Sequence, residues 1–193
     1  MVRPRTVILI VIVLTLLVAV RNVPDSPEFA VFQIKLLMPF RIAKLYSMPA
    51  DDYILMPVAG VSRVKVADTW HAPRPGGRKH EGQDIFAAKG TPVLSATDGV
   101  VVRINGGALG GNAVFVLGPG GRTYYYAHLS AYAPSLTAGL PVRRGELIGY
   151  VGNTGNARGT SPHLHFGVYT SAGAVNPYEL LRDGPFEEAA DSS

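Results

Sequence analysis

The sequence contains no cysteine among its 193 residues. This absence excludes a disulfide framework and a thiolate-ligated metal site, although it does not exclude an oxidising compartment. Internal repeats, coiled-coil heptads and low-complexity tracts are also missing, so a repeat architecture is not expected. The glycine-rich turns match neither a P-loop nor a dinucleotide fingerprint, and no helical pattern follows them, which argues against nucleotide binding.

Charge and hydrophobicity are both moderate. The formal net charge of +4 suits contact with an anionic cell wall or membrane, but it is also typical of an ordinary solvated surface. We expect no nucleic-acid partner. Hydrophobic residues make up 47% of the chain, which is enough for one core. The 22 glycines and 15 prolines between short apolar runs favour a turn-rich β protein over a helical one.

The first 21 residues have the pattern of an export segment. Arg3 and Arg5 precede an apolar run from Val7 to Val20, and Arg21 closes it. This pattern is typical of a signal peptide or a signal anchor. The run is shorter than the roughly 20 residues that cross a bilayer, yet its end lacks the small residues that signal cleavage requires. We therefore expect an uncleaved anchor in the cytoplasmic membrane with the domain facing the periplasm or cell wall, and a secreted protein if the signal is cleaved.

Residues 22–50 form a connector that is punctuated by proline. Pro39 divides an apolar stretch that also carries Lys35, Arg41 and Lys44. Because proline interrupts helical hydrogen bonding, we expect two short helices broken at Pro39. These helices would lie either on the membrane surface or against the domain.

Residues 51–182 have the pattern of one compact domain, with an acidic tail at residues 183–193. The expected fold is mainly β, a single glycine-rich antiparallel β-sheet or β-sandwich with a substrate groove, preceded by the hydrophobic N-terminal helix and the connector. The glycine-rich segment 118–121 predicts a hairpin turn, and Asn176 before Pro177 predicts a short capped helix. The expected strands lie at residues 53–58, 91–96, 99–104, 113–117, 122–127, 147–151 and 163–169.

Four of the five histidines gather in three short clusters. Alternate side chains of a strand share a face, so His163 and His165 would project together, about 7 Å apart along the strand. His80 and Asp84 would do the same in an extended segment. Imidazoles that face a carboxylate are the chemistry of a zinc site. A catalytic zinc keeps an open position, so one imidazole of the pair can bind metal while the other, or His128, serves proton transfer.

Four blocks of sequence resemble the lysostaphin-like (beta-lytic, LytM-type) zinc metallo-endopeptidases. The resemblance extends from about residue 52 to residue 181, and the blocks occur in the family order. They are RKHEGQDI at 78–85, GTPV leading to DGVV at 90–101, YAHLS at 126–130, and GELIGYVGNTG running into HLHF at 145–166. The resemblance implies that His80, Asp84 and His165 bind Zn²⁺ and that His128 and His163 are catalytic residues beside it. Which of these two histidines acts as general base stays open.

Simpler explanations exist for several of these residues. Asp84 also fits an ion pair with Arg78 or Lys79. His71 is expected to be an exposed loop histidine, with a place in the substrate groove beside Arg74 as the alternative.

Other polar and aromatic residues also have structural explanations. His128 fits a hydrogen-bonded turn histidine, and Asn112 and Asn153 fit turn-stabilising roles. The three tyrosines at 124–126 alternate as a strand requires, so at least one of them is expected in the core.

The resemblance implies a zinc-dependent endopeptidase that hydrolyses peptide bonds in peptidoglycan cross-links or stem peptides. A degenerate module that binds and activates another cell-wall hydrolase is the alternative, but such modules lack metal residues that are all present here. A metal-dependent nuclease would want more carboxylates than one aspartate beside the histidines. The pattern does not tell which peptide bond is cut.

Overall fold

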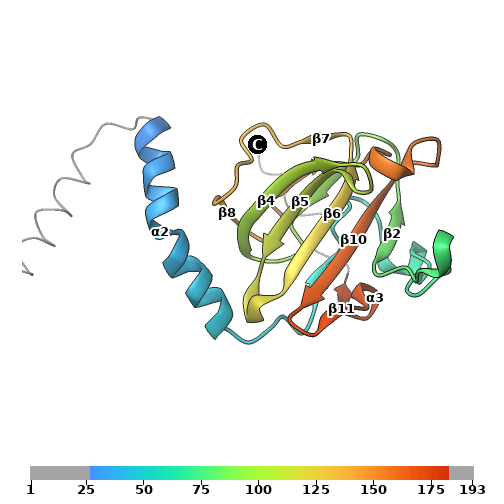
Figure 1. The fold of residues 1–193 in the computed structure, drawn as a ribbon, viewed down its shortest axis with the longest axis horizontal. Helices are drawn as coiled ribbons and strands as arrows, with labels where there is room; N and C mark the ends of the chain where they lie inside the picture. Colours follow the sequence, from blue (N-terminus) through green and yellow to red (C-terminus); the bar gives the residue numbers. More distant parts are fainter. Residues whose placement is uncertain (1–26, 183–193) are drawn as a thin grey trace, which may run out of the picture. The chain divides into compact units, whose positions relative to one another are not determined.

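The structure is a computed structural model that describes residues 27–182. The predicted anchor at residues 1–21 and the acidic tail lie outside the described residues. Among the residues that are described, no helix has the length and apolar character that a membrane crossing requires. The chain divides into two compact units, Met1–Met38 and Pro39–Ser193, and the β domain shown in Figure 1 belongs to the second unit.

A single helix, α2 (Pro27–Ser47), replaces the two short helices expected in the connector. The prediction of a break at Pro39 is wrong, because the helix continues through this residue. Proline removes one backbone N–H from a helix, but Pro39 is exposed, so water can satisfy the carbonyl that loses its partner. Near the end of the helix Leu45 is buried against Val100 and Leu117. This part of the connector therefore packs on the β domain.

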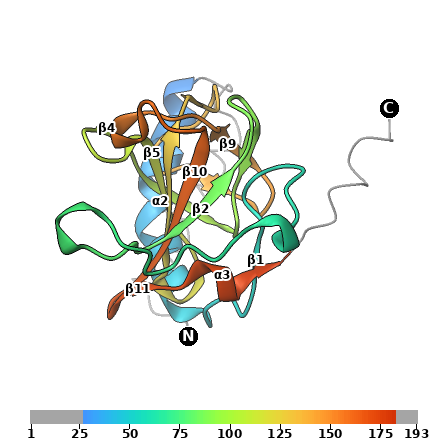
Figure 2. The ribbon, with the colours of Figure 1, turned by 90° about the vertical axis from the view of Figure 1, so that its right-hand side faces the viewer.

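The domain is built on a seven-stranded antiparallel sheet. Its main path runs β11–β10–β6–β5–β4–β8, and β2 pairs with the first half of β10, ahead of β11. Figure 2 shows β2 lying alongside β10. The strands are β2 (Gln83–Phe86), β4 (Gly99–Gly107), β5 (Gly111–Leu117), β6 (Thr123–Leu129), β8 (Pro141–Val142), β10 (His163–Thr170) and β11 (Gly173–Val175).

Two smaller sheets complete the core on one face of the main sheet. One has the order β3–β9–β7, and the other is the parallel pair β1–β12. Their buried side chains, such as Ile54, Val93 and Ile148, form one hydrophobic cluster with those of the main sheet. The elements are β1 (Ile54–Leu55), β3 (Pro92–Leu94), β7 (Ala131–Tyr132), β9 (Leu147–Tyr150), β12 (Leu181–Arg182), the short helix α3 (Pro177–Leu180), and 3₁₀ turns at Arg63–Lys65, Pro75–Gly77, Pro119–Gly121 and Gly155–Ala157.

Strand alternation places the histidines on the face opposite the core. Leu164 and Phe166 of β10 are fully buried in the hydrophobic cluster. His163 and His165 are offset from them by one residue, so they project from the other face. Burial of the apolar side chains therefore decides the direction of the polar ones.

The β elements expected from the sequence are confirmed. Each of the seven predicted runs contains a strand, although the run at 53–58 contributes only two strand residues. The segment 118–121 joins β5 to β6, with Leu117 opposite Thr123. The Asn176 side chain accepts a hydrogen bond from the backbone N–H of Tyr178 and caps α3. The short strands β2, β7, β8, β11 and β12 lie outside the predicted runs, and the segment of β2 was considered only as a conditional extended segment.

Candidate metal centre and active-site cleft

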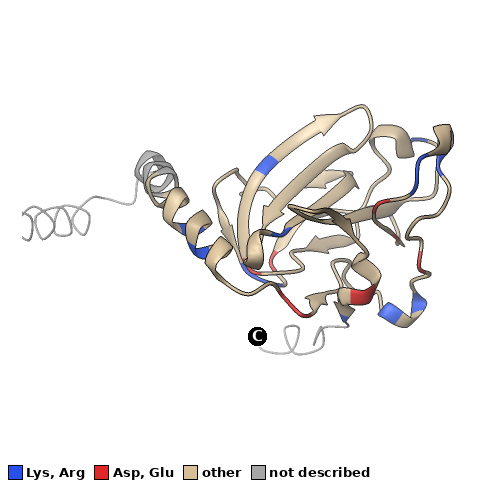
Figure 3. Ribbon diagram, turned by 60° about the horizontal axis from the view of Figure 1, so that its bottom comes forward, with Lys and Arg blue, Asp and Glu red and all other residues tan. Residues whose placement is uncertain are grey.

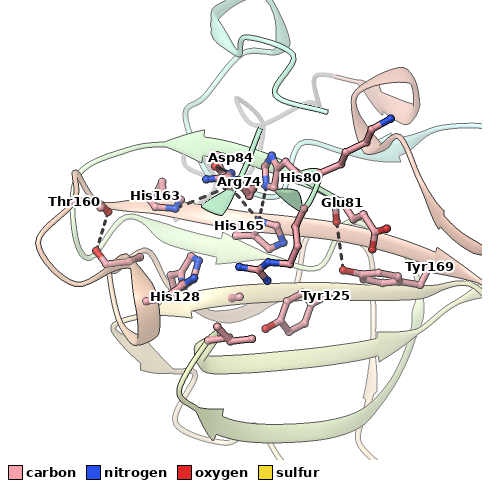
Figure 4. Close-up of a pocket in the computed structure, with 17 residues that line it drawn as sticks. Arg74, His80, Glu81, Asp84, Tyr125, His128, Thr160, His163, His165 and Tyr169 are labelled. Carbon is pink, nitrogen blue, oxygen red and sulfur yellow. Dashed lines mark hydrogen bonds and ion pairs between the residues drawn. The ribbon is translucent and has the colours of Figure 1, made fainter. Parts of the chain in front are cut away.

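A cleft of about 680 Å³ lies on the outer face of the main sheet. Figure 4 shows how residues from β2, β6, β10 and three loops converge on it. Asp84 is the only acidic residue in the strands of the main sheet, and Figure 3 shows how few charged residues these strands carry. The lining includes Arg74, Arg78, Lys79, His80, Glu81, Asp84, Tyr125, His128, Thr160, His163, His165 and Tyr169.

His80, Asp84 and His165 form a compact triangle at the base of this cleft. His165 lies directly opposite Asp84 in the β2–β10 ladder. Nε2 of His80 is 2.8 Å from Nδ1 of His165, and Oδ1 of Asp84 is 3.1 Å from each of these nitrogens. In a tetrahedral zinc site with bonds of 2.0–2.2 Å, ligand atoms lie about 3.3 Å apart. The three donor atoms therefore fit a zinc ion after an expansion of a few tenths of an ångström.

Hydrogen bonds to neighbouring groups orient the triangle. Nδ1 of His80 lies 2.8 Å from the carbonyl oxygen of Thr69, so that nitrogen donates to the carbonyl and Nε2 faces the triangle. The two oxygens of the Asp84 carboxylate have different partners. Oδ1 faces the imidazoles of His80 and His165, and Oδ2 accepts a hydrogen bond from Arg74. Gly82 makes room for the ring of His165, since a Cβ at this position would lie 2.5 Å from Cε1 of His165.

His128 and His163 lie beside the triangle with their rings oriented by backbone carbonyls. Nδ1 of His128 is 2.9 Å from the oxygen of Thr154, and Nδ1 of His163 is 2.9 Å from the oxygen of Ser161. Each Nδ1 thus donates, which leaves Nε2 as the acceptor of each ring. The two ring centroids are 5.1 Å apart. Both imidazoles therefore present a basic nitrogen in the cleft.

Burial and neighbouring charges determine the protonation states of the site. Burial, with the positive fields of His163 and His165, lowers the pKa of His128 to about 4, so this ring is neutral at pH 7. Burial also lowers the pKa of His165, despite the opposing effect of Asp84. For Asp84, burial raises the pKa, but hydrogen bonds from His165, His80 and Arg74 outweigh it and hold the pKa well below its ordinary value. At Asp84 and His165 the lowered pKa favours the deprotonated form, which is the form that metal binding needs.

A β-bulge turns His128 toward the cleft. Strand alternation would place His128 on the core side, since Ala127 before it already lines the cleft. The β5–β6 register shifts here, because Asn112 pairs with Leu129 while Val114 pairs with Tyr126. His128 has a φ of 64°, in the left-handed region. The bulge therefore re-aims a side chain that the strand pattern would have buried.

The structure brings together every residue proposed for the site from the sequence. His80, Asp84, His128, His163 and His165 all line the cleft. The pairing of Asp84 is different from the alternatives considered, because its ion-pair partner is Arg74 instead of Arg78 or Lys79. No spacing in the sequence indicated this contact.

The residues with structural explanations behave as expected. His71 is exposed and stacks on Trp70, with ring centroids 4.5 Å apart, and it is not part of the cleft lining. Tyr124 and Tyr126 are fully buried, whereas Tyr125 lines the cleft. The side-chain amide of Asn112 donates to the carbonyl of Leu129 at the end of β6, and that of Asn153 donates to the carbonyl of Thr160. Tyr125, Tyr169 and Thr154 are parts of the site that sequence reasoning missed.

The chain matches peptidase family M23 over residues 78–177, and it belongs to this family. The DD-carboxypeptidase/endopeptidase Mpg of Neisseria meningitidis is 40% identical over 116 residues, which are 60% of this chain and 26% of that protein. The peptidoglycan DD-endopeptidase ShyA of Vibrio cholerae is 40% identical over 99 residues, which are 50% of this chain and 22% of that protein.

The fold is also similar to solved structures of the family. The catalytic domain of lysostaphin from Staphylococcus simulans has a TM-score of 0.52 and 30% identity, and the match covers 60% of this chain and 91% of that domain. The chain matches only about a quarter of the length of the curated relatives named above. The match to lysostaphin covers nearly the whole of that catalytic domain. The region that this chain shares with the family is therefore the domain that carries the cleft.

Proposed function

We propose that the cleft is the active site of a zinc-dependent endopeptidase that hydrolyses peptide bonds in peptidoglycan cross-links or stem peptides. The observation that carries this proposal is the triangle of His80, Asp84 and His165, with the imidazoles of His128 and His163 beside it. Membership of peptidase family M23 supports the reaction class. The names of Mpg and ShyA support a peptidoglycan peptide as substrate.

His80, Asp84 and His165 would hold the metal through Nε2, Oδ1 and Nδ1. Zinc bound there supplies a Lewis acid for the scissile carbonyl and the attacking water. Three protein ligands would leave a fourth coordination position for water, as a catalytic zinc requires. The donor set of two imidazoles and one carboxylate is the set that zinc peptidases use.

His128 and His163 would handle the protons of the reaction. Nε2 of one imidazole would accept a proton from the attacking water and then return it to the leaving amine, and the other imidazole would stabilise developing negative charge only when its Nε2 carries a proton. A pKa of about 4 keeps His128 neutral over the physiological range, so its Nε2 lone pair is not blocked by a proton. The presence of all five residues in one cleft argues against a module that only activates another hydrolase.

We propose further that the domain acts outside the cytoplasmic membrane. The apolar run from Val7 to Val20, preceded by Arg3 and Arg5, supports export and retention by an uncleaved anchor. Protease shaving of cells without outer barriers tests this, since an outward-facing domain is degraded. A domain that resists external protease there, or that fractionates with the cytosol, contradicts the proposed location.

The function is tested by incubation of the purified full chain with purified muropeptides, with and without a zinc chelator. We expect new peptide termini in the products by mass spectrometry, and no new termini after chelation. The same products identify the bond that is cut. Cleavage that survives complete removal of metal, or no cleavage of any muropeptide by zinc-loaded protein, contradicts the proposal.

A further inference from the structure

Thr154 occupies the gap that the β-bulge opens between β5 and β6. Its hydroxyl accepts a hydrogen bond of 2.9 Å from the backbone N–H of Asn112 and donates one of 2.9 Å to the carbonyl of Leu129. Asn112 and Leu129 are paired residues of the two strands. The hydroxyl thus stands between backbone groups that an uninterrupted ladder would bond directly.

The same residue also holds the imidazole of His128. The carbonyl of Thr154 accepts a hydrogen bond of 2.9 Å from Nδ1 of His128. In return, the backbone N–H of Thr154 donates a longer hydrogen bond, 3.4 Å, to the carbonyl of His128. One residue therefore contacts both the bulge that turns His128 toward the cleft and the ring nitrogen that sets its tautomer. The side chain and the backbone of Thr154 act on the same histidine.

Two glycines allow this close approach. A Cβ on Gly111 would lie 2.2 Å from Oγ1 of Thr154, and a Cβ on Gly155 would lie 2.3 Å from the backbone nitrogen of Gly111. Both glycines also have positive φ values, 60° and 69°. The loop that carries Thr154 can therefore contact the β5–β6 bulge because neither Gly111 in β5 nor Gly155 in the loop has a side chain.

We propose that Thr154 is a positioning residue for His128, and that its hydroxyl maintains the bulge that keeps Nδ1 of His128 donating and Nε2 directed into the cleft. The inference rests on the proposed function of His128 in proton transfer, whichever of the two histidines is the base. The hydroxyl suits this place because it accepts from the backbone N–H of Asn112 and also donates to the carbonyl of Leu129. A methyl group in its place leaves the N–H of Asn112 without this acceptor and removes one donor from the carbonyl of Leu129, which keeps the side-chain amide of Asn112 at 3.2 Å.

The test compares Thr154→Val with Thr154→Ser in the zinc-loaded full chain. Valine keeps the size of the side chain and loses the hydroxyl, whereas serine keeps the hydroxyl. Long-range ¹H–¹⁵N correlation spectra of histidine-labelled protein report the tautomer of each ring, and the spectrum of His128→Gln assigns the signals. We expect His128 to be protonated at Nδ1 in the wild type and in Thr154→Ser, and to lose this single tautomer in Thr154→Val.

Kinetics provide the second readout. Loss of a supporting contact of this kind typically costs about 10–100-fold in activity, so we expect kcat of Thr154→Val to fall by that factor with KM and zinc content unchanged. Thr91→Val is the matched control, because the hydroxyl of Thr91 bonds the carbonyl of Ala88 in a turn outside the cleft lining. This control should change neither the spectrum nor kcat.

Each other outcome overturns the inference. A native His128 tautomer with unchanged kcat in Thr154→Val contradicts it, as does a loss in Thr154→Ser that equals the loss in Thr154→Val. A fall in zinc content that matches the fall in kcat assigns Thr154 to the metal site instead. If Thr154→Val does not fold, Thr154→Cys provides the same comparison, since a thiol is only a weak donor. Absence of peptidase activity in the wild type contradicts the proposed function, while the tautomer still reports on Thr154.

Discussion

The two halves of the cleft are built by different means. The metal half depends on the regular β2–β10 ladder, in which Asp84 lies opposite His165, with His80 just before β2. The proton-transfer half depends on an irregularity, the β5–β6 bulge that turns His128. Regular strand register is readable from a period of two residues, but a bulge shifts that period by one. The strand faces of Asp84 and His165 are therefore readable from residue spacing, whereas the direction of His128 depends on the bulge and on its contact with Thr154.

The largest effect is expected from removal of a residue of the metal half. Asp84→Ala, His80→Ala or His165→Ala should each lose zinc and all detectable peptidase activity, because two remaining protein ligands hold zinc poorly. Metal analysis after desalting checks this. His71→Ala is the control, since His71 is an exposed histidine outside the cleft lining. Full zinc retention in Asp84→Ala would overturn the ligand assignment.

Removal of an imidazole of the other half should separate catalysis from metal binding. His128→Ala and His163→Ala should keep one zinc per chain and lose about 10²–10⁴-fold in kcat, the usual contribution of a positioned proton-transfer group. Metal analysis and steady-state kinetics on the same samples give the two numbers. If His163→Ala loses its metal and His165→Ala does not, the roles of the two histidines in β10 are reversed.

A smaller effect is expected at Gly82, which lies against the ring of His165 and is not part of the cleft lining. In Gly82→Ala the new methyl group would press on the ring of His165, so zinc affinity should fall about 10–100-fold, the usual cost of disturbing a ligand's surroundings. Competition with a chelator measures this. Gly107→Ala is the matched control, because a Cβ at Gly107 has no atom within 4 Å and its φ is ordinary. Equal affinities in the two variants would show that the His165 ring shifts without cost.

The smallest effect concerns pH and the metal-free protein. The pKa of His128 is lowered from 6.5 to about 4, mainly by burial. Between pH 4 and pH 6.5 this imidazole is therefore protonated in the unfolded chain and neutral in the folded chain. Stability from this group is therefore present above pH 6.5 and is lost as pH falls towards 4. His128→Gln should flatten the fall in unfolding midpoint over this window. Parallel pH profiles in the two proteins would show that His128 is not protected from protonation.

The expectations that held are those that depend on residue spacing. Alternation of apolar residues predicted the strands, and the glycine-rich segment 118–121 predicted the β5–β6 hairpin. The three histidine clusters predicted one site, and all five proposed residues line one cleft. The prediction of a break at Pro39 was wrong. Proline removes one helical hydrogen bond, but Pro39 is exposed, so water can bond the carbonyl that loses its N–H partner.

Residue spacing alone sets which side chains share a strand face, since alternation follows from backbone geometry over two to four residues. That spacing places His163 on the same side as His165, opposite Leu164. The bond of Arg74 to Asp84 depends on the folded chain, because it joins a loop to a strand. The position of His128 depends on the folded chain as well, because Thr154 bonds it across 26 residues, and such a contact forms only after the strands have packed.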